Sequence, residues 1–150
     1  MGASAVSRTH NSGDHFRLTI GSRLEQLAMV HALIEGIARQ YEFDEEMSNA
    51  ILVAVIEAGT NAIQHGNAFD EAKLVTFQFT VHSDDIVVQV DDYGKGFDPA
   101  KVANPTDEAQ LLNPHGRGLY LMRSLMDEVR FETRQDAGTT VTLRKARPAS

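Results

Sequence analysis

The 150-residue sequence contains no cysteine and no tryptophan, and it has only four prolines. The absence of cysteine excludes disulfides, thiolate-bound zinc, iron–sulfur clusters and a cysteine nucleophile. Positive charge is also scarce, because 14 Lys and Arg stand against 21 Asp and Glu and give a net charge of -7. Proteins that bind nucleic acid usually carry a basic surface, so we expect no nucleic-acid partner.

Long apolar segments are absent as well. The longest apolar run extends only from Ala50 to Ile56, whereas a membrane-spanning helix needs about 20 residues. Residues 1–14 contain no apolar stretch that suits a signal peptide, and we expect them to form a disordered N-terminal arm. These features predict a cytoplasmic protein that does not enter a membrane. Residues 15–147 have the length and composition of one globular domain.

Hydrophobic periodicity predicts the order β-α-α-β-β-α-β-β, with a long loop before the third helix. Helical spacing indicates one helix that opens at Ser22, a second that begins at Asp44 and a third over 118–126. Adjacent hairpins favour a mixed, mostly antiparallel sheet covered on one face by helices, which is a two-layer α/β sandwich. Alternating apolar residues indicate strands over 16–20, 75–81, 86–90, 129–133 and 139–143.

The second predicted helix is apolar nearly all round, which favours a buried, central position. Between Ala50 and Ile63 its only ionisable residue is Glu57, and an unpaired buried carboxylate is costly. Asn61 and His65 follow at intervals of four residues, so the three side chains share one face of the helix. They form either a hydrogen-bonded polar cluster in the core or a catalytic site, with Glu57 as general base and Asn61 as a ligand of Mg²⁺.

A D-x-G-x-G segment, formed by Asp92, Gly94 and Gly96, follows the strand that ends at Val90. Its glycines allow the backbone to approach a ligand closely. A carboxylate at Asp92 is suited to accept a hydrogen bond from an exocyclic amino group such as that of adenine. The simpler interpretation is a tight turn.

A second pair of glycines, Gly116 and Gly118, flanks Arg117 at the start of the third predicted helix. The N-terminal end of a helix offers free N–H groups and positive potential, which favour a phosphate. Together with Lys95 and Mg²⁺, this helix end and Arg117 would compensate the charge of a nucleotide triphosphate on an acidic protein. The alternative is a glycine-rich hinge with a solvated arginine.

In combination, the three motifs resemble the nucleotide-binding fold shared by DNA gyrase, Hsp90, histidine kinases and MutL. The segments that begin at Glu57, Asp92 and Gly116 are most similar to those of the small anti-sigma factor serine/threonine kinases. The resemblance covers about residues 15–145. It implies an α/β fold of the Bergerat type, with ATP and Mg²⁺ as cofactors.

The resemblance also implies a role for each matched residue. Glu57 is the base for a serine or threonine hydroxyl of a protein substrate, Asn61 holds Mg²⁺, and Asp92 accepts a hydrogen bond from the adenine amino group. A lid over the phosphates spans about residues 99–115. The other residues expected to bind ATP are His65, Gly94, Lys95, Gly96, His115, Gly116, Arg117, Gly118, Leu119 and Thr140.

By the same resemblance, the protein is an anti-sigma factor that sequesters a sigma factor, phosphorylates a small antagonist protein and forms a homodimer. The alternative is a regulator of this fold that senses ATP or ADP without catalysis, because lid residues 101–114 do not match the family one by one. The catalytic part of a histidine kinase fits less well, since we predict only one helix before that of Glu57. A gyrase-like or Hsp90-like ATPase would require further domains.

Overall fold

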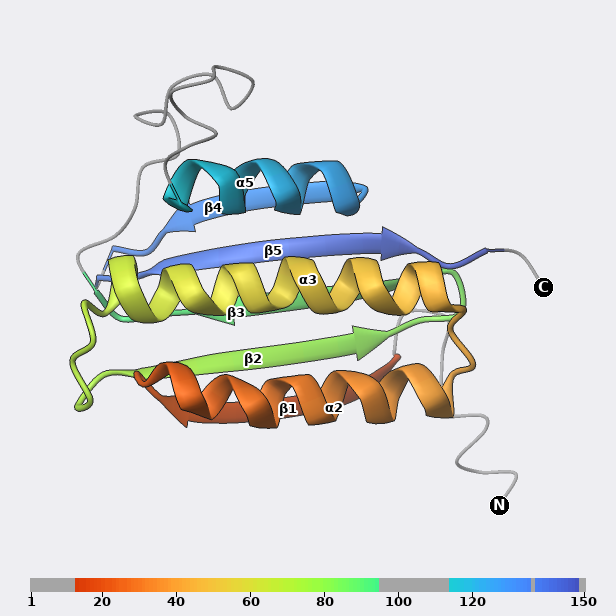
Figure 1. The fold of residues 1–150 in the computed structure, drawn as a ribbon, viewed down its shortest axis with the longest axis horizontal. Coiled ribbons are helices and arrows are strands. Elements are labelled where there is room, and N and C mark those ends of the chain that lie inside the picture. The colour runs from red at the N-terminus through yellow and green to blue at the C-terminus, as the bar shows by residue number, and fades with distance from the viewer. Residues whose placement is uncertain (1–12, 95–113, 136, 149–150) are drawn as a thin grey trace.

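A computed structural model describes residues 13–94, 114–135 and 137–148 of the chain. Within these residues, five strands form one sheet in the order β1-β2-β3-β5-β4, and each neighbouring pair is antiparallel. The α-helices all lie on one face of this sheet (Figure 1). The predicted two-layer α/β sandwich is confirmed, and the described sheet is antiparallel throughout rather than mixed.

The predicted elements are all present, in the predicted order. The α-helices are α2 (Leu27–Gln40), α3 (Glu45–Asn61) and α5 (Pro114–Leu125). A short 3-10 helix, η1 (Leu24–Gln26), precedes α2, and a π-helical turn, η2 (Ala62–Gly66), continues α3. In the part of the chain that the structure describes, none of the helices is long and apolar enough to span a membrane. The strands are β1 (Asp14–Gly21), β2 (Leu74–Val81), β3 (Asp85–Asp91), β4 (Glu128–Thr133) and β5 (Thr139–Ala146).

The ends of some elements differ from the sequence-based expectations. Asp14, which we expected in a disordered arm, belongs to β1 and pairs with Val81 of β2. Residues 1–12 of the expected arm lie outside the described residues. Helix α5 begins at Pro114, four residues before the predicted start, so its first turn lies in the expected lid.

The two predicted helix caps have different outcomes. Asp44 caps α3 as predicted, because its carboxylate accepts a hydrogen bond of 2.8 Å from the N–H of Met47. Ser22 does not cap the first helix, and its hydroxyl donates instead to the carbonyl of Lys73. The residue at the N-cap of η1 is Arg23, which makes no side-chain cap bond. The tertiary hydrogen bond to the start of β2 therefore replaces the local capping box.

The hydrophobic core lies between the helical layer and the sheet face that it covers. Helix α3 is central, and it buries Ile51, Ala54 and Val55 to at least 99%. The opposite sheet face carries polar side chains such as Gln78 and Gln89. This alternation of apolar and polar residues is the pattern expected of a sheet covered on one side. The buried apolar residues of β2 and β3 are Val75, Phe77, Phe79, Val81, Ile86, Val88 and Val90, each at most 3% exposed.

Asn67 connects the end of the central helix to the sheet and is only 1% exposed. Its amide nitrogen donates to the Ser22 hydroxyl at 2.8 Å and to the carbonyls of Leu74 at 3.1 Å and Lys73 at 3.3 Å. Its amide oxygen accepts a hydrogen bond of 2.8 Å from the N–H of Tyr93. One buried side chain thus joins the segments that follow β1, precede β2 and follow β3.

Replacement of Asn67 by alanine is expected to destabilise the fold. The change removes these hydrogen bonds and leaves buried partners unsatisfied, at a cost of about 1–3 kcal/mol for each such group. We expect the free energy of unfolding of Asn67→Ala to fall by roughly 2–4 kcal/mol, measured by chemical denaturation. The control is Asn49→Ala, at an exposed position of α3, with an expected change within about 0.5 kcal/mol. Equal stability of the two variants would contradict the role of Asn67.

Candidate active site

Glu57, Asn61 and His65 line one cavity where α3 passes into η2. The cavity has a volume of about 490 Å³, and α5 forms its other wall. The structure thus brings together the predicted polar row and two residues predicted for phosphate binding, Arg117 and Gly118. The remaining lining residues are Thr60, Gln64 and Leu121.

Glu57 has the electrostatic environment of a group that can exchange a proton. Burial of its carboxylate raises the pKa of Glu57 above its ordinary value, and the nearby positive charge of Arg117 lowers it in part. The carboxylate lies on an otherwise apolar stretch of α3, which explains the burial. A carboxylate with a raised pKa next to a cavity is a candidate general base.

Gly118 allows α5 to approach the carboxylate of Glu57. A Cβ atom at this position would lie 2.8 Å from Oε2 of Glu57 and 3.6 Å from Nδ2 of Asn61. The Nδ2 atom of Asn61 is itself buried. Any larger residue at position 118 would therefore displace the Glu57 carboxylate from its place in the cavity.

Asp92, which directly follows β3, is only 4% exposed. Its Oδ1 atom accepts hydrogen bonds of 3.1 Å from the N–H groups of both Gly94 and Thr139. Burial raises the pKa of Asp92, whereas these two hydrogen bonds and the positive charge of Arg134 lower it. The carboxylate is therefore held in one orientation by backbone groups from two segments.

The polar row and Asp92 meet at Gly66, the residue that follows His65. A Cβ atom on Gly66 would lie 2.3 Å from Oδ2 of Asp92, and one on Gly94 would lie 1.4 Å from the carbonyl oxygen of Gly66. The end of η2 and the segment after β3 are thus in direct backbone contact. The structure thus requires the absence of a side chain at Gly66, which was not among the residues predicted for the site.

The structure places Thr140 beside Asp91 rather than beside Asp92. This residue pairs with Asp91, and its hydroxyl lies 2.6 Å from the Asp91 carboxylate and accepts a hydrogen bond of 2.8 Å from Arg134. Because side chains alternate along a strand, Thr140 lies on the sheet face opposite Asp92. The neighbouring Thr139, 1% exposed, lies on the face of Asp92.

The remaining predicted residues have different outcomes. Leu119 is 1% exposed and packs in the hydrophobic core, so its side chain does not line the cavity. Lys95 and Gly96 lie outside the described residues, as does most of the expected lid. The backbone of His115 and Gly116 belongs to the first turn of α5.

Three residues of the site region were not identified from the sequence: Asn67, Arg134 and Thr139. An asparagine after a glycine is a common helix terminator, so the sequence offered a weak signal for Asn67. The alternation of residues along the last strand was a signal for Thr139. No pattern in the sequence indicated Arg134, because its contacts form only where three separate segments of the chain meet.

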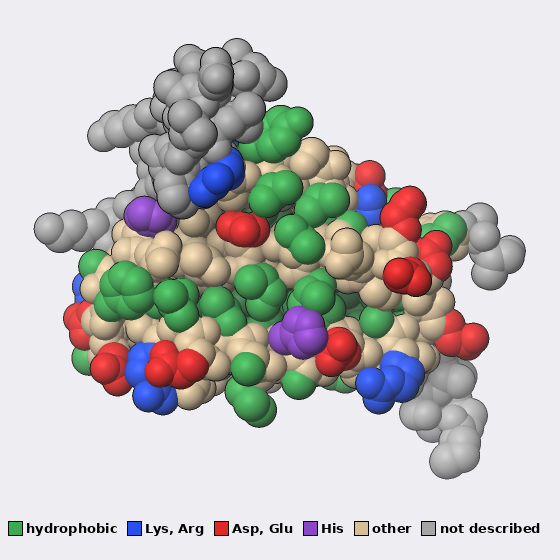
Figure 2. Space-filling view, in the orientation of Figure 1, with side chains coloured by type: hydrophobic (Ala, Val, Ile, Leu, Met, Phe, Trp, Pro, Cys, Tyr) green, Lys and Arg blue, Asp and Glu red, His purple; other side chains and the backbone are tan. Residues whose placement is uncertain are grey.

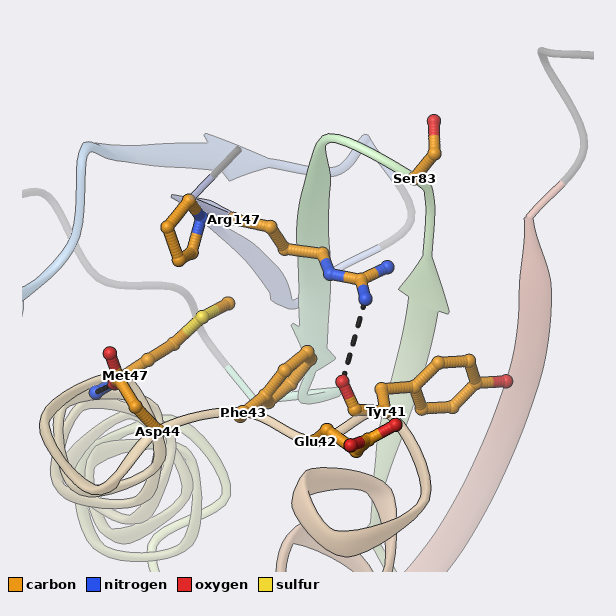
Figure 3. Close-up of a pocket in the computed structure, with 8 residues that line it drawn as sticks. Tyr41, Glu42, Phe43, Asp44, Met47, Ser83 and Arg147 are labelled. Carbon is orange, nitrogen blue, oxygen red and sulfur yellow. Dashed lines mark hydrogen bonds between the residues drawn. The ribbon is translucent and has the colours of Figure 1, made fainter. Parts of the chain in front are cut away.

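A second cavity, of about 440 Å³, lies at the opposite end of α3 (Figure 3). Arg147 crosses it and donates to the carbonyls of His82 at 2.6 Å and Tyr41 at 3.5 Å. The guanidinium group also lies 5.8 Å from the ring centroid of Tyr41 and 5.4 Å from that of Phe43. These contacts hold the segment after β5 against the connection between α2 and α3, and none of the sequence motifs reaches this cavity.

The outer face of the helical layer is largely apolar. Figure 2 shows hydrophobic side chains gathered in bands along this face, with many of the charged side chains toward its margins. Met29 is 56% exposed, and Leu33, Leu52 and Ile56 are partly buried against the core. Ile56 directly precedes Glu57 on α3.

Known sequences resemble this chain over most of its length. A sequence model of the family described as "Histidine kinase-like ATPase domain" matches residues 20–145. The serine-protein kinase RsbW of Bacillus subtilis (strain 168) is 30% identical over 141 residues, which cover 90% of this chain and 87% of that protein. The serine-protein kinase RsbW of Bacillus licheniformis is 31% identical over 140 residues, which cover 89% and 86% of the two chains.

Two solved structures share the fold. The structure of the RsbU and RsbW domains of Rv1364c from Mycobacterium tuberculosis matches with a TM-score of 0.65 and 21% identity, over 91% of this chain and 34% of that one. A chain of the SiaB-SiaC complex from Pseudomonas aeruginosa matches with a TM-score of 0.63 and 13% identity, over 97% of both chains. At these identities the likeness shows the fold alone.

The backbone contact between Gly66 and Gly94 predicts that alanine substitutions have opposite effects at two glycines. Gly94→Ala would force apart backbone segments and is expected to lower the free energy of unfolding by about 1–3 kcal/mol. Gly36, inside α2, has no atom within 4 Å of an added Cβ, so Gly36→Ala is expected to raise it by about 0.5–1 kcal/mol. Chemical denaturation measures both changes. A Gly94→Ala variant as stable as Gly36→Ala would contradict the contact.

Proposed function

We propose that this chain, which belongs to the histidine kinase-like ATPase domain family and is related to the serine-protein kinases named RsbW, is an ATP-dependent serine/threonine protein kinase. The observation that carries the proposal is the cavity that unites Glu57, Asn61 and Arg117 beside the N-terminal half of α5. A proton acceptor, an oxygen ligand and a positive charge are the groups that phosphoryl transfer requires.

In the proposed reaction, Glu57 accepts the proton of a serine or threonine hydroxyl of the protein substrate. The hydroxyl oxygen forms a bond to the γ-phosphorus of ATP, while the bond between that phosphorus and the β–γ bridging oxygen breaks. ADP leaves with the electron pair of the broken bond, and the proton remains on Glu57. The raised pKa of Glu57 supports this role, because a base works best when its pKa is near the operating pH.

The donor groups of the cavity fit ATP with Mg²⁺. Asn61 supplies an amide oxygen, a hard ligand of the kind that Mg²⁺ accepts alongside phosphate oxygens and water. Mg²⁺, when bound, would neutralise charge on the phosphates. We propose that Arg117, His65 and the start of α5 contact the phosphates.

For the adenine, we propose recognition by Asp92, with Thr139 in place of Thr140 as the threonine nearby. Both the orientation of the Asp92 carboxylate and its hydrogen bond from Thr139 support this assignment. Gly66 and Gly94 support it as well, because their missing side chains let the backbone pack around Asp92.

As partners we propose a small antagonist protein that carries the acceptor serine and a sigma factor that the kinase sequesters. The exposed or partly buried apolar side chains of α2 and α3, among them Met29, Leu33, Leu52 and Ile56, support a protein as the acceptor, because exposed apolar patches mark interaction surfaces. We further propose a homodimer and a cytoplasmic location, and no nucleic-acid partner. The alternative of an ATP or ADP sensor without catalysis has less support, because the relatives are named kinases.

The proposed base is tested by label transfer from γ-labelled ATP with Mg²⁺ in a lysate of the source cell. We expect the wild type to label a small protein, Glu57→Ala to transfer at least about 10²-fold more slowly, and Asp92→Asn to lose transfer through weaker ATP binding. Glu57→Ala should retain its affinity for ATP, measured by calorimetry. Unchanged transfer by Glu57→Ala would refute the base. ATP binding without any labelled protein would favour the nucleotide sensor.

The charge of Arg117 predicts a shift in the pH dependence of transfer. Transfer requires the ionised carboxylate of Glu57, so the rate falls as the pH drops below its pKa. Arg117 lowers the pKa of Glu57; therefore Arg117→Gln should raise it and move the acid limb of the rate profile to higher pH, at saturating ATP. Arg123→Gln, at an exposed position on the same helix, should leave the limb in place. An unmoved limb in Arg117→Gln would disprove this coupling.

A further inference from the structure

We infer that Arg134 is a positioning residue for recognition of the nucleobase, because it holds Asp92 in the place from which its carboxylate reads the exocyclic amino group. The inference rests on the proposed role of Asp92 in adenine binding. Arg134 lies outside the sequence motifs and does not line the cavity of Glu57. Its influence on the nucleotide would therefore pass through Asp92.

The Arg134 guanidinium group ties together three segments behind the site. Its Nη2 atom donates to the main-chain carbonyl of Asp92 and, at 3.4 Å, to that of Ala137 in the turn between β4 and β5. Its Nη1 atom donates to the Thr140 hydroxyl at 2.8 Å and lies 3.5 Å from the Asp91 carboxylate. One side chain thus fixes the end of β3 relative to the start of β5.

The backbone around Asp92 is held at three consecutive points. The N–H of Asp92 donates to the carbonyl of Thr139 at 3.0 Å, its carbonyl accepts from Arg134, and the next N–H, that of Tyr93, donates to Asn67 at 2.8 Å. The guanidinium group of Arg134 also lies 4.9 Å from the ring centroid of Tyr93. Removal of the guanidinium group would therefore release the main-chain carbonyl of Asp92, which is the middle one of these three points.

The turn at Gly138 packs tightly around this arrangement. Gly138 has a φ of +103°, and a Cβ atom here would lie 2.2 Å from the carbonyl oxygen of Asp92 and 2.3 Å from Nη2 of Arg134. The guanidinium therefore fills a space that the turn and the end of β3 enclose between them. Because the fit is close, a shorter side chain would leave both neighbours without this support.

The positive charge of Arg134, like its hydrogen bonds, favours recognition of an amino group by Asp92. Burial raises the pKa of Asp92, and the positive charge of Arg134 is among the influences that lower it, whereas neighbouring Asp91 raises it. An ionised carboxylate only accepts hydrogen bonds, as an amino group requires, while a protonated one also donates. Arg134 thereby favours the form of Asp92 that suits a 6-amino purine.

The test compares ATP with purine ribonucleoside triphosphate, which lacks the 6-amino group. We expect the wild type to bind ATP at least about tenfold more tightly, as is typical where a site pairs with one polar group of a ligand. In Arg134→Gln this ratio should fall to within about threefold, through weaker ATP binding, with kcat at saturating ATP changed less than about twofold. Arg134→Lys, which keeps the charge and one donor, should give an intermediate ratio.

The matched control is Arg130→Gln on β4, because Arg130 is 64% exposed and its ion pair, at 3.0 Å, is with Glu128. This variant should keep the wild-type ratio. If Arg134→Gln weakens both nucleotides equally, Arg134 is only structural and the inference is wrong. If the wild type does not distinguish the two nucleotides, the proposed role of Asp92 fails instead. If thermal melting shows that Arg134→Gln is unfolded, the ratio of the two nucleotide affinities is measured in Arg134→Lys instead. A wild-type ratio in Arg134→Lys would overturn the inference.

Discussion

The contact between the end of η2 and the segment after β3 is the constraint on which the site depends. Glu57 and Asn61 belong to the helical layer, whereas Asp92 directly follows strand β3, and apart from the hydrogen bonds of Asn67 the two layers meet mainly through apolar packing. At Gly66 they meet backbone to backbone, because Gly94 lies against its carbonyl oxygen. Hydrophobic packing tolerates small shifts of a helix over a sheet, but this close backbone contact does not, so it holds Asp92 in a fixed place relative to the end of the helix that carries Glu57 and Asn61.

The two carboxylates of the site are stabilised in different ways, and the difference matches the roles proposed for them. The Asp92 carboxylate accepts two backbone hydrogen bonds, and its main-chain carbonyl accepts one from Arg134, so the orientation of Asp92 is fixed. Glu57 feels the positive charge of Arg117 and lines a cavity. The cavity leaves space beside its carboxylate for the hydroxyl group of a substrate. A recognition group gains from being held rigidly, whereas a base must approach its substrate and change protonation state during the reaction.

The sequence correctly predicted those features of the fold that depend on local residue patterns. Alternation and helical spacing identified the strands and helices, and the polar row on an apolar helix identified Glu57, Asn61 and His65, which do share a cavity. Predictions were wrong where a contact with a distant segment replaced the local interaction that the sequence pattern indicated. Ser22 lost its capping role to the carbonyl of Lys73, 51 residues away. Local pattern also does not decide between Thr139 and Thr140, because the register of β5 against β3 determines which of the two lies on the face of Asp92.

Arg134 shows most clearly what could not be predicted from the sequence, because nothing in its local sequence distinguishes it from an exposed arginine before a turn. Arg130, four residues earlier, is such an arginine, at 64% exposure against 25% for Arg134. Only the pairing of β5 with both β3 and β4 brings the guanidinium of Arg134 to the carbonyl of Asp92. The chemistry of Glu57 depends on α3 and α5, whereas the support of Asp92 depends on β3 and the β4–β5 hairpin. Because these two sets of contacts share little beyond Gly66 and Asn67, we expect a change in the hairpin to alter the proposed recognition of the nucleobase while the cavity of Glu57 stays intact.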